Sequence, residues 1–313
     1  KKDTGVENKE PEITKPEITQ MEITPAGSDA AEKKASVEKT VKEQETVAVP
    51  HPQIDLSPAK LADFDYVMNQ FFILDSNTET NAQQICGTRF LKEDLSIKQD
   101  PEVPQILIYH THSQETFADS DNDPSTSIVG IGRYLTEILN NKYKIPTMHH
   151  EGVYDLINGK LDRSEAYEFA KPEVEQILAE NPSIEVVIDL HRDGVADTTH
   201  LVTEINGKPT AQIMFFNGLC RIYDNGNLVP TAGLDNPNLE DNLAFSFTMK
   251  YAGDKLYPGF VRKNYLKTYR YSLHMLPKSL LVEVGAQTNT KEEAMNAMEP
   301  LAEILMAVVN KNT

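Results

Sequence analysis

The stretch ILIYHTHSQETF, residues 106–117, starts as a buried strand and ends in polar chemistry. Its first four residues are apolar or aromatic, which suits a pleated strand covered by the rest of the fold. Two histidines, a serine, a glutamine and a glutamate follow within a few positions. A loop, a polar part of the core and a metal site all remain open for this stretch alone, so its meaning depends on the other strands.

Two further apolar strands end in the same way. Residues 185–190, EVVIDL, run into HRDG, and residues 280–284, LLVEV, run into Gly285. Amphipathic helical patterns lie between and after these strands, over residues 127–142, 164–180, 238–252 and 291–310. Short, continuously apolar strands that alternate with helices are typical of a sheet covered on both faces. The sequence therefore predicts an α/β fold.

The middle of the chain indicates that this sheet is mixed. Residues 202–205 and 211–217 have the pattern of two strands on either side of Asn206-Gly207. The Asn-Gly pair favours the primed turn of a hairpin, which joins antiparallel strands. We therefore expect a mixed, mostly parallel sheet flanked by helices.

The first 56 residues differ from the rest in composition. They are rich in Glu, Lys, Thr, Pro and Val, and residues 11–25 carry the short repeat PEITK, PEITQ, MEITP. Such a repeat is too short to bury an apolar face, and its charges and prolines are typical of disorder. Ser57-Pro58 is a good helix start, and apolar residues recur at helical spacing from there to Phe72. We therefore predict a disordered linker over residues 1–56 and one folded domain over residues 57–313.

The charge and the cysteine count exclude several classes of protein. A formal net charge of −18 argues against sequence-independent binding to nucleic acid and against electrostatic docking on anionic lipid. Cys86 and Cys220 are the only cysteines, which excludes a disulfide framework and leaves a single bridge open. No apolar run reaches the ~18 residues of a membrane span, and the chain starts at Lys1 without a methionine. We expect any signal peptide or membrane anchor to lie upstream.

The polar residues at the strand ends include the ligands of a metal site. Ligands collect beyond the carboxyl ends of strands in covered α/β sheets, and His112 and Glu115 stand there in an H-x-x-E relation. His191, from the HRDG segment, completes a set of two histidines and one glutamate. Catalytic zinc sites use three such ligands and leave one position for water, whose pKa falls from ~15.7 to about 7. We therefore predict that His112, Glu115 and His191 bind zinc.

A zinc hydrolase also needs a base that is not a metal ligand. Glu283 lies between two valines in the third strand, and an apolar setting raises the pKa of a carboxylate, so we predict that Glu283 is this base. Arg192 is a second catalytic candidate, which either stabilises a developing oxyanion or pairs with Asp193 or Asp189. Asp189 is also a candidate to hold His191 by accepting a hydrogen bond.

Ser113 and the other histidines are weaker candidates. His110 ranks second to His112 as a ligand. His149 and His150 suit either the surface or the wall of a cleft. Ser113 lacks the strained strand-to-helix turn of a nucleophilic serine, so a serine triad is disfavoured.

Several motifs occur in an informative order. They are IYHTHSQETF (108–117), VIDLHRDG (187–194), INGK (205–208) followed by AQIMFF (211–216), and LLVEVGAQTNT (280–290). With these motifs the chain resembles the stage II sporulation protein P family of endospore-forming bacteria over residues 60–313. The resemblance implies a zinc-dependent peptidoglycan hydrolase, with a fold similar to that of N-acetylmuramoyl-L-alanine amidases.

The resemblance also implies a reaction and its residues. The enzyme would remove stem peptides from the glycan strands of peptidoglycan, and would also cut peptide cross-links as an endopeptidase. Carried over residue by residue, His112, Glu115 and His191 are the ligands and Glu283 is the catalytic glutamate. Related amidases take their ligand glutamate from the start of the helix after the first strand. Residues 127–131 hold no acid, which makes Glu115 the natural substitute.

A place and partners follow from the same resemblance. The family acts during engulfment of the forespore, in the space between the mother cell and forespore membranes, held by an N-terminal membrane segment outside this chain. Its partners are the stage II sporulation proteins D and M.

Two other functions stay open on chemistry alone. A zinc carboxypeptidase-like hydrolase of free peptides would use the same residues. A non-catalytic scaffold that binds peptidoglycan or partner proteins would fit the long tail and the acidic composition.

Overall fold

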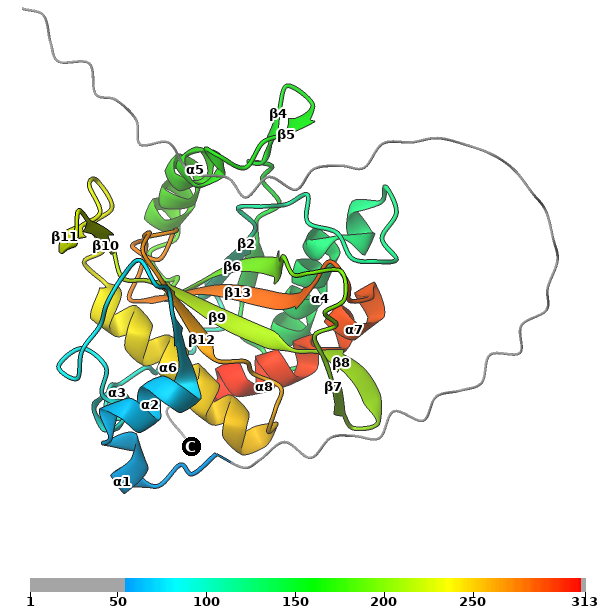
Figure 1. Ribbon diagram of the computed structural model, residues 1–313. Coiled ribbons are helices and arrows are strands. Elements are labelled where there is room, and N and C mark those ends of the chain that lie inside the picture. The colour runs from blue at the N-terminus through cyan, green and yellow to red at the C-terminus, as the bar shows by residue number, and fades with distance from the viewer. Residues whose placement is uncertain (1–53, 311–313) are drawn as a thin grey trace, which may run out of the picture. The chain divides into compact units, whose positions relative to one another are not determined.

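A computed structural model describes residues 54–310 (Figure 1). The linker predicted over residues 1–56 lies almost entirely outside this range and stays a prediction. At the start of the range, Ile54 and Leu56 pack against a core cluster that is built around Phe71 and Phe247. No helix within residues 54–310 has the length and apolar character that crossing a membrane requires.

A seven-stranded sheet forms the centre of the described residues (Figure 1). Its strands, in spatial order, are β1 (Phe72–Leu74), β12 (Asn264–Lys267), β9 (Ile213–Gly218), β13 (Lys278–Ala286), β6 (Val186–Asp193), β2 (Ile106–Tyr109) and β3 (Thr147–His149). Five of the six neighbouring pairs are parallel, and β9 with β13 is antiparallel. The predicted mixed, mostly parallel sheet is therefore confirmed.

Helices cover both faces of this sheet, as its continuous apolar strands predicted. The covering helices are α4 (Ile128–Asn141), α5 (Ala166–Glu180), α6 (Leu239–Leu256) and α8 (Met298–Val309). Ile106 and Ile108 of β2 belong to the core that includes α4, α6 and α8. Leu107 and Tyr109 belong to a second core, which packs against α5. Successive side chains of a strand point to opposite faces, so β2 contributes to both cores and must be apolar throughout.

Short elements connect these layers. They are α1 (Pro58–Leu61), α2 (Phe64–Phe71), α3 (Gly87–Phe90), the 3-10 helix η1 (Pro124–Thr126), β4 (Leu156–Ile157), β5 (Lys160–Leu161), β7 (Val202–Ile205), β8 (Lys208–Ala211), β10 (Arg221–Asp224), β11 (Asn227–Pro230) and α7 (Lys291–Asn296). Figure 1 shows the β4–β5 hairpin projecting above α5, with the β7–β8 hairpin on the opposite side of the sheet.

The predicted pairing of residues 202–205 with 211–217 is wrong. β7 pairs instead with β8, around Asn206-Gly207, whose φ angles of 53° and 75° are those of a primed turn. A two-residue turn fixes the register, so the residues directly after it take the pairing positions. The apolar residues 213–218 form β9, which enters the central sheet antiparallel to β13.

The helix expected from Ser57 to Phe72 is divided in two. α1 ends at Leu61, and the Asp63 side chain caps the start of α2 by accepting a hydrogen bond from the Tyr66 N–H at 3.1 Å. The last predicted helix, 291–310, is likewise divided into α7 and α8. Both cysteines of the chain are free, so the single bridge left open by the sequence is not formed.

Candidate metal centre

His112, Glu115 and His191 lie together, with one ligand atom from each within 4.8 Å of the others. His112 and Glu115 follow β2, and His191 lies in β6. β2 and β6 are parallel neighbours with Tyr109 opposite Asp189. Residues just beyond this pair therefore meet at the carboxyl end of the sheet, where the sequence predicted a site.

Two buried aspartates hold the turn that carries the first two ligands. The Asp189 carboxylate accepts hydrogen bonds from the Thr111 N–H at 2.9 Å and from the Thr111 hydroxyl at 2.6 Å. Asp155 accepts hydrogen bonds from the Ser113 hydroxyl and the Gln114 N–H, both at 3.1 Å. These contacts fix the backbone on both sides of His112, so Ser113 has a structural partner.

The Glu115 carboxylate faces both imidazoles. Its Oε1 lies 3.5 Å from His112 Nδ1, and its Oε2 lies 3.5 Å from His191 Nδ1. Oε2 also accepts a hydrogen bond from the Arg192 N–H at 2.8 Å. Glu115 and His191 are almost fully buried, and the His112 side chain is 17% exposed, which leaves one side of the cluster open to solvent.

The three residues fit a zinc ion. Ligands at ~2.0–2.1 Å from a tetrahedral zinc ion lie about 3.4 Å apart, close to the 3.5 Å between Glu115 and each imidazole. Metal-bound histidines usually have a carboxylate on the second nitrogen, and Asp189 Oδ1 lies 2.7 Å from His191 Nε2. Zinc binding by this set stays a prediction that the geometry favours.

The ionisation of the cluster follows from its mutual contacts. Burial lowers the pKa of His112, so this imidazole is neutral. Burial alone would raise the pKa of Glu115, but contacts with His112 and His191 outweigh burial and bring that pKa well below its usual range. Burial opposes charge on His191, yet Asp189 and Glu115 raise its pKa well above the ordinary value. Without a metal ion, His191 therefore carries a proton at neutral pH.

Glu283 stands beside His191 on the neighbouring strand β13. Burial raises the pKa of Glu283 to about 8, the nearby His191 opposes that change, and Glu115 and Asp193 add to it. Its Oε2 is buried and has no hydrogen-bond partner within the described range. A buried carboxyl group with a raised pKa has a high affinity for a proton, which is a property that the predicted general base requires, and the role of Glu283 as that base stays a prediction.

Arg192 directs its guanidinium at backbone carbonyls. Its Nε donates to the Thr116 oxygen at 3.0 Å, and its Nη1 donates to the Asp193 oxygen at 3.3 Å. The Asp193 carboxylate accepts instead from Arg262 at 2.8 Å. Asp189 contacts Thr111 and His191, as the sequence suggested for His191, so neither acid is the partner of Arg192. A catalytic role for Arg192 stays a prediction.

His110 lies outside the cluster. Its Nδ1 donates to the Leu190 oxygen at 2.8 Å, because a carbonyl can only accept, and its Nε2 faces His149 Nε2 at 2.8 Å. Helix α4 passes directly over this pair at Gly132, where a Cβ would lie 2.6 Å from His110 Nε2. The preference for His112 over His110 thus agrees with the geometry, and the His149 side chain is 7% exposed beneath α4. His150 contacts the Tyr154 hydroxyl at 2.6 Å.

Two side chains near the cluster were missed from the sequence. Arg163 precedes α5, and its Nη1 lies 3.6 Å from Glu115 Oε1. Tyr167, in the first turn of α5, has its ring 5.5 Å from that of His112 and 5.6 Å from that of Tyr271. Neither residue belongs to a motif, and both reach the site only because α5 packs on this face of the sheet. No local signal in the sequence marks them.

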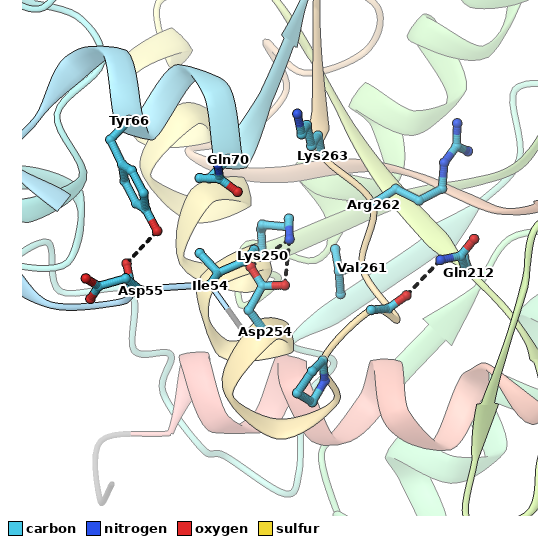
Figure 2. Close-up of a pocket in the computed structure, with 12 residues that line it drawn as sticks. Ile54, Asp55, Tyr66, Gln70, Gln212, Lys250, Asp254, Val261, Arg262 and Lys263 are labelled. Carbon is cyan, nitrogen blue, oxygen red and sulfur yellow. Dashed lines mark hydrogen bonds and ion pairs between the residues drawn. The ribbon is translucent and has the colours of Figure 1, made fainter. Parts of the chain in front are cut away.

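A cavity of about 550 Å³ forms a second region of interest (Figure 2). Tyr66 and Gln70 of α2 line one side, and Lys250 and Asp254 of α6 line another. Figure 2 shows Lys250 directed at Asp254, and its Nζ lies 2.6 Å from both carboxylate oxygens. None of the candidate metal ligands lines this cavity.

Comparisons with known proteins agree with the motifs. The model of the stage II sporulation protein P family matches residues 4–306. Stage II sporulation protein P of Bacillus subtilis (strain 168) is 24% identical over 216 residues, which are 64% of this chain and 49% of the relative. The chain thus spans about half the length of the curated relative that it matches.

Solved structures with a similar fold include N-acetylmuramoyl-L-alanine amidases. AmiC2 of Nostoc punctiforme is 12% identical, covers 67% of this chain and 98% of its own, and has a TM-score of 0.39. The CwlD amidase of Clostridioides difficile, solved in complex with the GerS lipoprotein, is 15% identical, covers 65% of this chain and 94% of its own, and has a TM-score of 0.38. Scores this low describe a partial overlap of folds. The match of the family model over nearly the whole length carries the assignment, and the chain belongs to the stage II sporulation protein P family.

Proposed function

We propose that this chain is a zinc-dependent peptidoglycan hydrolase of the N-acetylmuramoyl-L-alanine amidase type. It would cleave the amide bond between N-acetylmuramic acid and the first residue of the stem peptide. The proposal is supported by membership of the family and by the cluster of His112, Glu115 and His191. The observation that carries it is the Glu115 carboxylate facing both imidazoles at 3.5 Å, with Glu283 alongside.

In this proposal the three clustered residues hold zinc, and Glu283 transfers a proton from the attacking water to the leaving amine. Zinc, when bound, lowers the pKa of a water molecule and polarises a carbonyl group. Glu283 Oε2, which has no described partner, accepts the proton of the attacking water and later donates it to the leaving amine. Asp189 keeps the His191 ring in place through its contact with Nε2.

The candidate ligands are held in place by contacts within the protein. Glu115 is held by three groups, namely both imidazoles and the Arg192 N–H, so its carboxylate has little freedom to turn. The turn before it is fixed by Asp155 and Asp189. Preorganised ligands of this kind lower the cost of binding a metal ion and orienting a substrate.

The wider role is part of the same proposal. From the family we infer that the chain acts in sporulation, during engulfment, in the space between the mother cell and forespore membranes. We also infer endopeptidase activity on cross-links, an upstream membrane anchor, and the stage II sporulation proteins D and M as partners. The net charge of −18 argues against a nucleic-acid partner.

Digestion of purified sacculi tests the proposed reaction. We expect the zinc-loaded protein to release intact stem peptides and to leave glycan without peptide, as seen by mass spectrometry of the products. His191→Ala should lose both zinc and activity, whereas Arg89→Gln, at a surface ion pair with Glu240, should retain both. Cleavage confined to the ends of free peptides would instead support a carboxypeptidase-like hydrolase. Tight binding to sacculi without zinc or cleavage would support a scaffold.

A further inference from the structure

Arg163 has an unusual setting beside the candidate metal centre. It lies in the connection from β5 to α5, and its side chain is 35% exposed. Its Nη1 lies 3.6 Å from Glu115 Oε1, which is longer than a hydrogen bond. Its Nε is buried and has no hydrogen-bond partner within residues 54–310. A guanidinium has five N–H donors, so most of its capacity is left over.

The other arginines near the site are committed. Arg192 donates to two backbone carbonyls, and Arg262 donates to the Asp193 carboxylate at 2.8 Å. Glu115, the anion beside Arg163, already faces two imidazoles and accepts from the Arg192 N–H. Arg163 therefore makes no hydrogen bond to Glu115 and can donate hydrogen bonds to another anion at the edge of the cluster.

The surroundings of Arg163 belong to the open side of the site. Tyr167, one turn further along the chain, places its ring 5.5 Å from His112, the most exposed of the three candidate ligands. Tyr271 and Phe216 continue this aromatic surface, with ring centroids 5.6 Å and 6.0 Å apart in succession from Tyr167. These half-buried rings and Arg163 lie beside the same two candidate ligands, His112 and Glu115.

We propose that Arg163 binds a carboxylate of the substrate, so that the site selects peptides with a free carboxylate near the cleaved amide. The proposal rests on the proposed function, because the stem peptide supplies the carboxylate. The planar guanidinium forms two parallel hydrogen bonds with a carboxylate, which a neutral sugar or amide group cannot match. Partial burial beside the cluster strengthens such a pair relative to one at the open surface.

Two synthetic muramoyl peptides of equal length test this inference. Their second residue bears a free carboxylate in one and a carboxamide in the other. We expect the wild-type protein to prefer the carboxylate by about 10- to 100-fold in kcat/KM, mainly through KM. Arg163→Gln should lower kcat/KM on the carboxylate peptide to about the value on the carboxamide peptide, and Arg163→Lys should restore part of the preference.

Controls separate this role from others. Arg89→Gln, far from the site in an ion pair with Glu240, should keep the full preference. An equal loss on both peptides in Arg163→Gln would overturn the inference, because it would indicate an effect on Glu115 or on the reaction itself. An unchanged preference would overturn it as well. Thermal melting and zinc content of each variant show that the fold and the metal site are intact.

A binding measurement keeps this test apart from the proposed function. Calorimetry with Glu283→Gln protein compares the affinities of the two peptides without turnover. Tighter binding of the carboxylate peptide that depends on Arg163 would support the inference. This conclusion would hold even if the wild-type protein hydrolysed neither peptide, because a lack of hydrolysis would count only against the amidase assignment. Equal affinities for the two peptides would overturn the inference. Hydrolysis of both peptides by the wild-type protein would still support the proposed function.

Discussion

Two regions of this molecule bury charged groups, and they do so differently. In the cavity of Figure 2, Lys250 and Asp254 come from one helix, are 3% and 5% exposed, and lie 2.6 Å apart. Each is the main partner of the other, and the Phe71 ring lies 5.7 Å from the ammonium group. At the metal centre, by contrast, Glu115 is shared by residues from separate strands, and nearby polar atoms remain without a described partner.

The difference is the one expected between a structural ion pair and the functional cluster that we propose. Burial lowers the pKa of Lys250 and raises that of Asp254, so the pair is held against desolvation by its own short contact. The candidate metal centre leaves Glu283 Oε2 unpaired in the described structure, a cost that a protein retains where a ligand or a reaction uses that atom. Residues at the first region should govern stability, and residues at the second should govern activity.

Glu283→Gln should give the largest effect at the second region. The amide cannot accept the proton of water, so kcat on sacculi should fall by about 10²- to 10⁴-fold. Zinc content, measured by elemental analysis of the purified protein, should stay at the wild-type level because Glu283 is outside the cluster of candidate ligands.

This variant can break the comparison. An active Glu283→Gln protein would show that Glu283 is not the base, and the unpaired Oε2 would then need another explanation. Loss of zinc together with activity would place Glu283 among the ligands instead.

Asp254→Ala should give the largest effect at the first region. It leaves a buried ammonium group without its partner, so the free energy of unfolding should fall by about 3–5 kcal/mol. The double variant Lys250→Met, Asp254→Leu removes both charges and should recover most of that loss. Urea unfolding measures both changes. The kcat of the folded protein should stay at the wild-type value in either variant, and a drop in kcat would mean that the two regions are coupled.

The sequence predicted that the candidate ligands lie together because their signals are local. His112 and Glu115 stand three residues apart after an apolar run, and His191 follows a second run of the same kind. Parallel pairing of the two strands brings these ends together without any further information. The sheet class followed from the same runs.

The parts of the fold and of the site that the sequence did not predict depend on contacts between segments that are far apart in the sequence. Arg163 and Glu115 are 48 positions apart in the sequence, and the packing of α5 brings them together. The partner of residues 202–205 was assigned wrongly because the apolar residues 211–216 are the stronger strand signal after the turn, whereas the register of the turn selects Lys208–Ala211. Lys250 and Asp254 do stand four residues apart, but nothing in α6 alone indicates that α2 will bury them.

Asp189→Asn should have a smaller effect than the substitutions above. It weakens the acceptor on His191 Nε2, so zinc affinity should fall by about 10- to 100-fold. Asp155→Asn is a matched control, because Asp155 is buried and holds the same turn through Ser113 and Gln114. Competition with a zinc chelator measures both affinities. An equal loss in the two variants would mean that Asp189 acts on the turn and has no special role at His191.

The smallest expected effect is the dependence of zinc affinity on pH. Asp189 and Glu115 raise the pKa of His191 against burial, so this imidazole holds a proton at pH values below its raised pKa, whereas His112, whose pKa burial lowers, holds none at neutral pH. Zinc binds the neutral imidazole, so one proton must leave and the affinity should rise about tenfold per pH unit before levelling above the raised pKa. Calorimetry in two buffers of different ionisation enthalpy counts that proton. Asp189→Asn removes the nearest negative charge, so levelling should start at a lower pH in that variant. A zinc affinity that does not change from about pH 6 to 7 in the wild-type protein would show that His191 is already neutral. The candidate ligands would then bind zinc without a change of charge, and this contrast with the prediction would remove the difference in protonation from the comparison of the two regions.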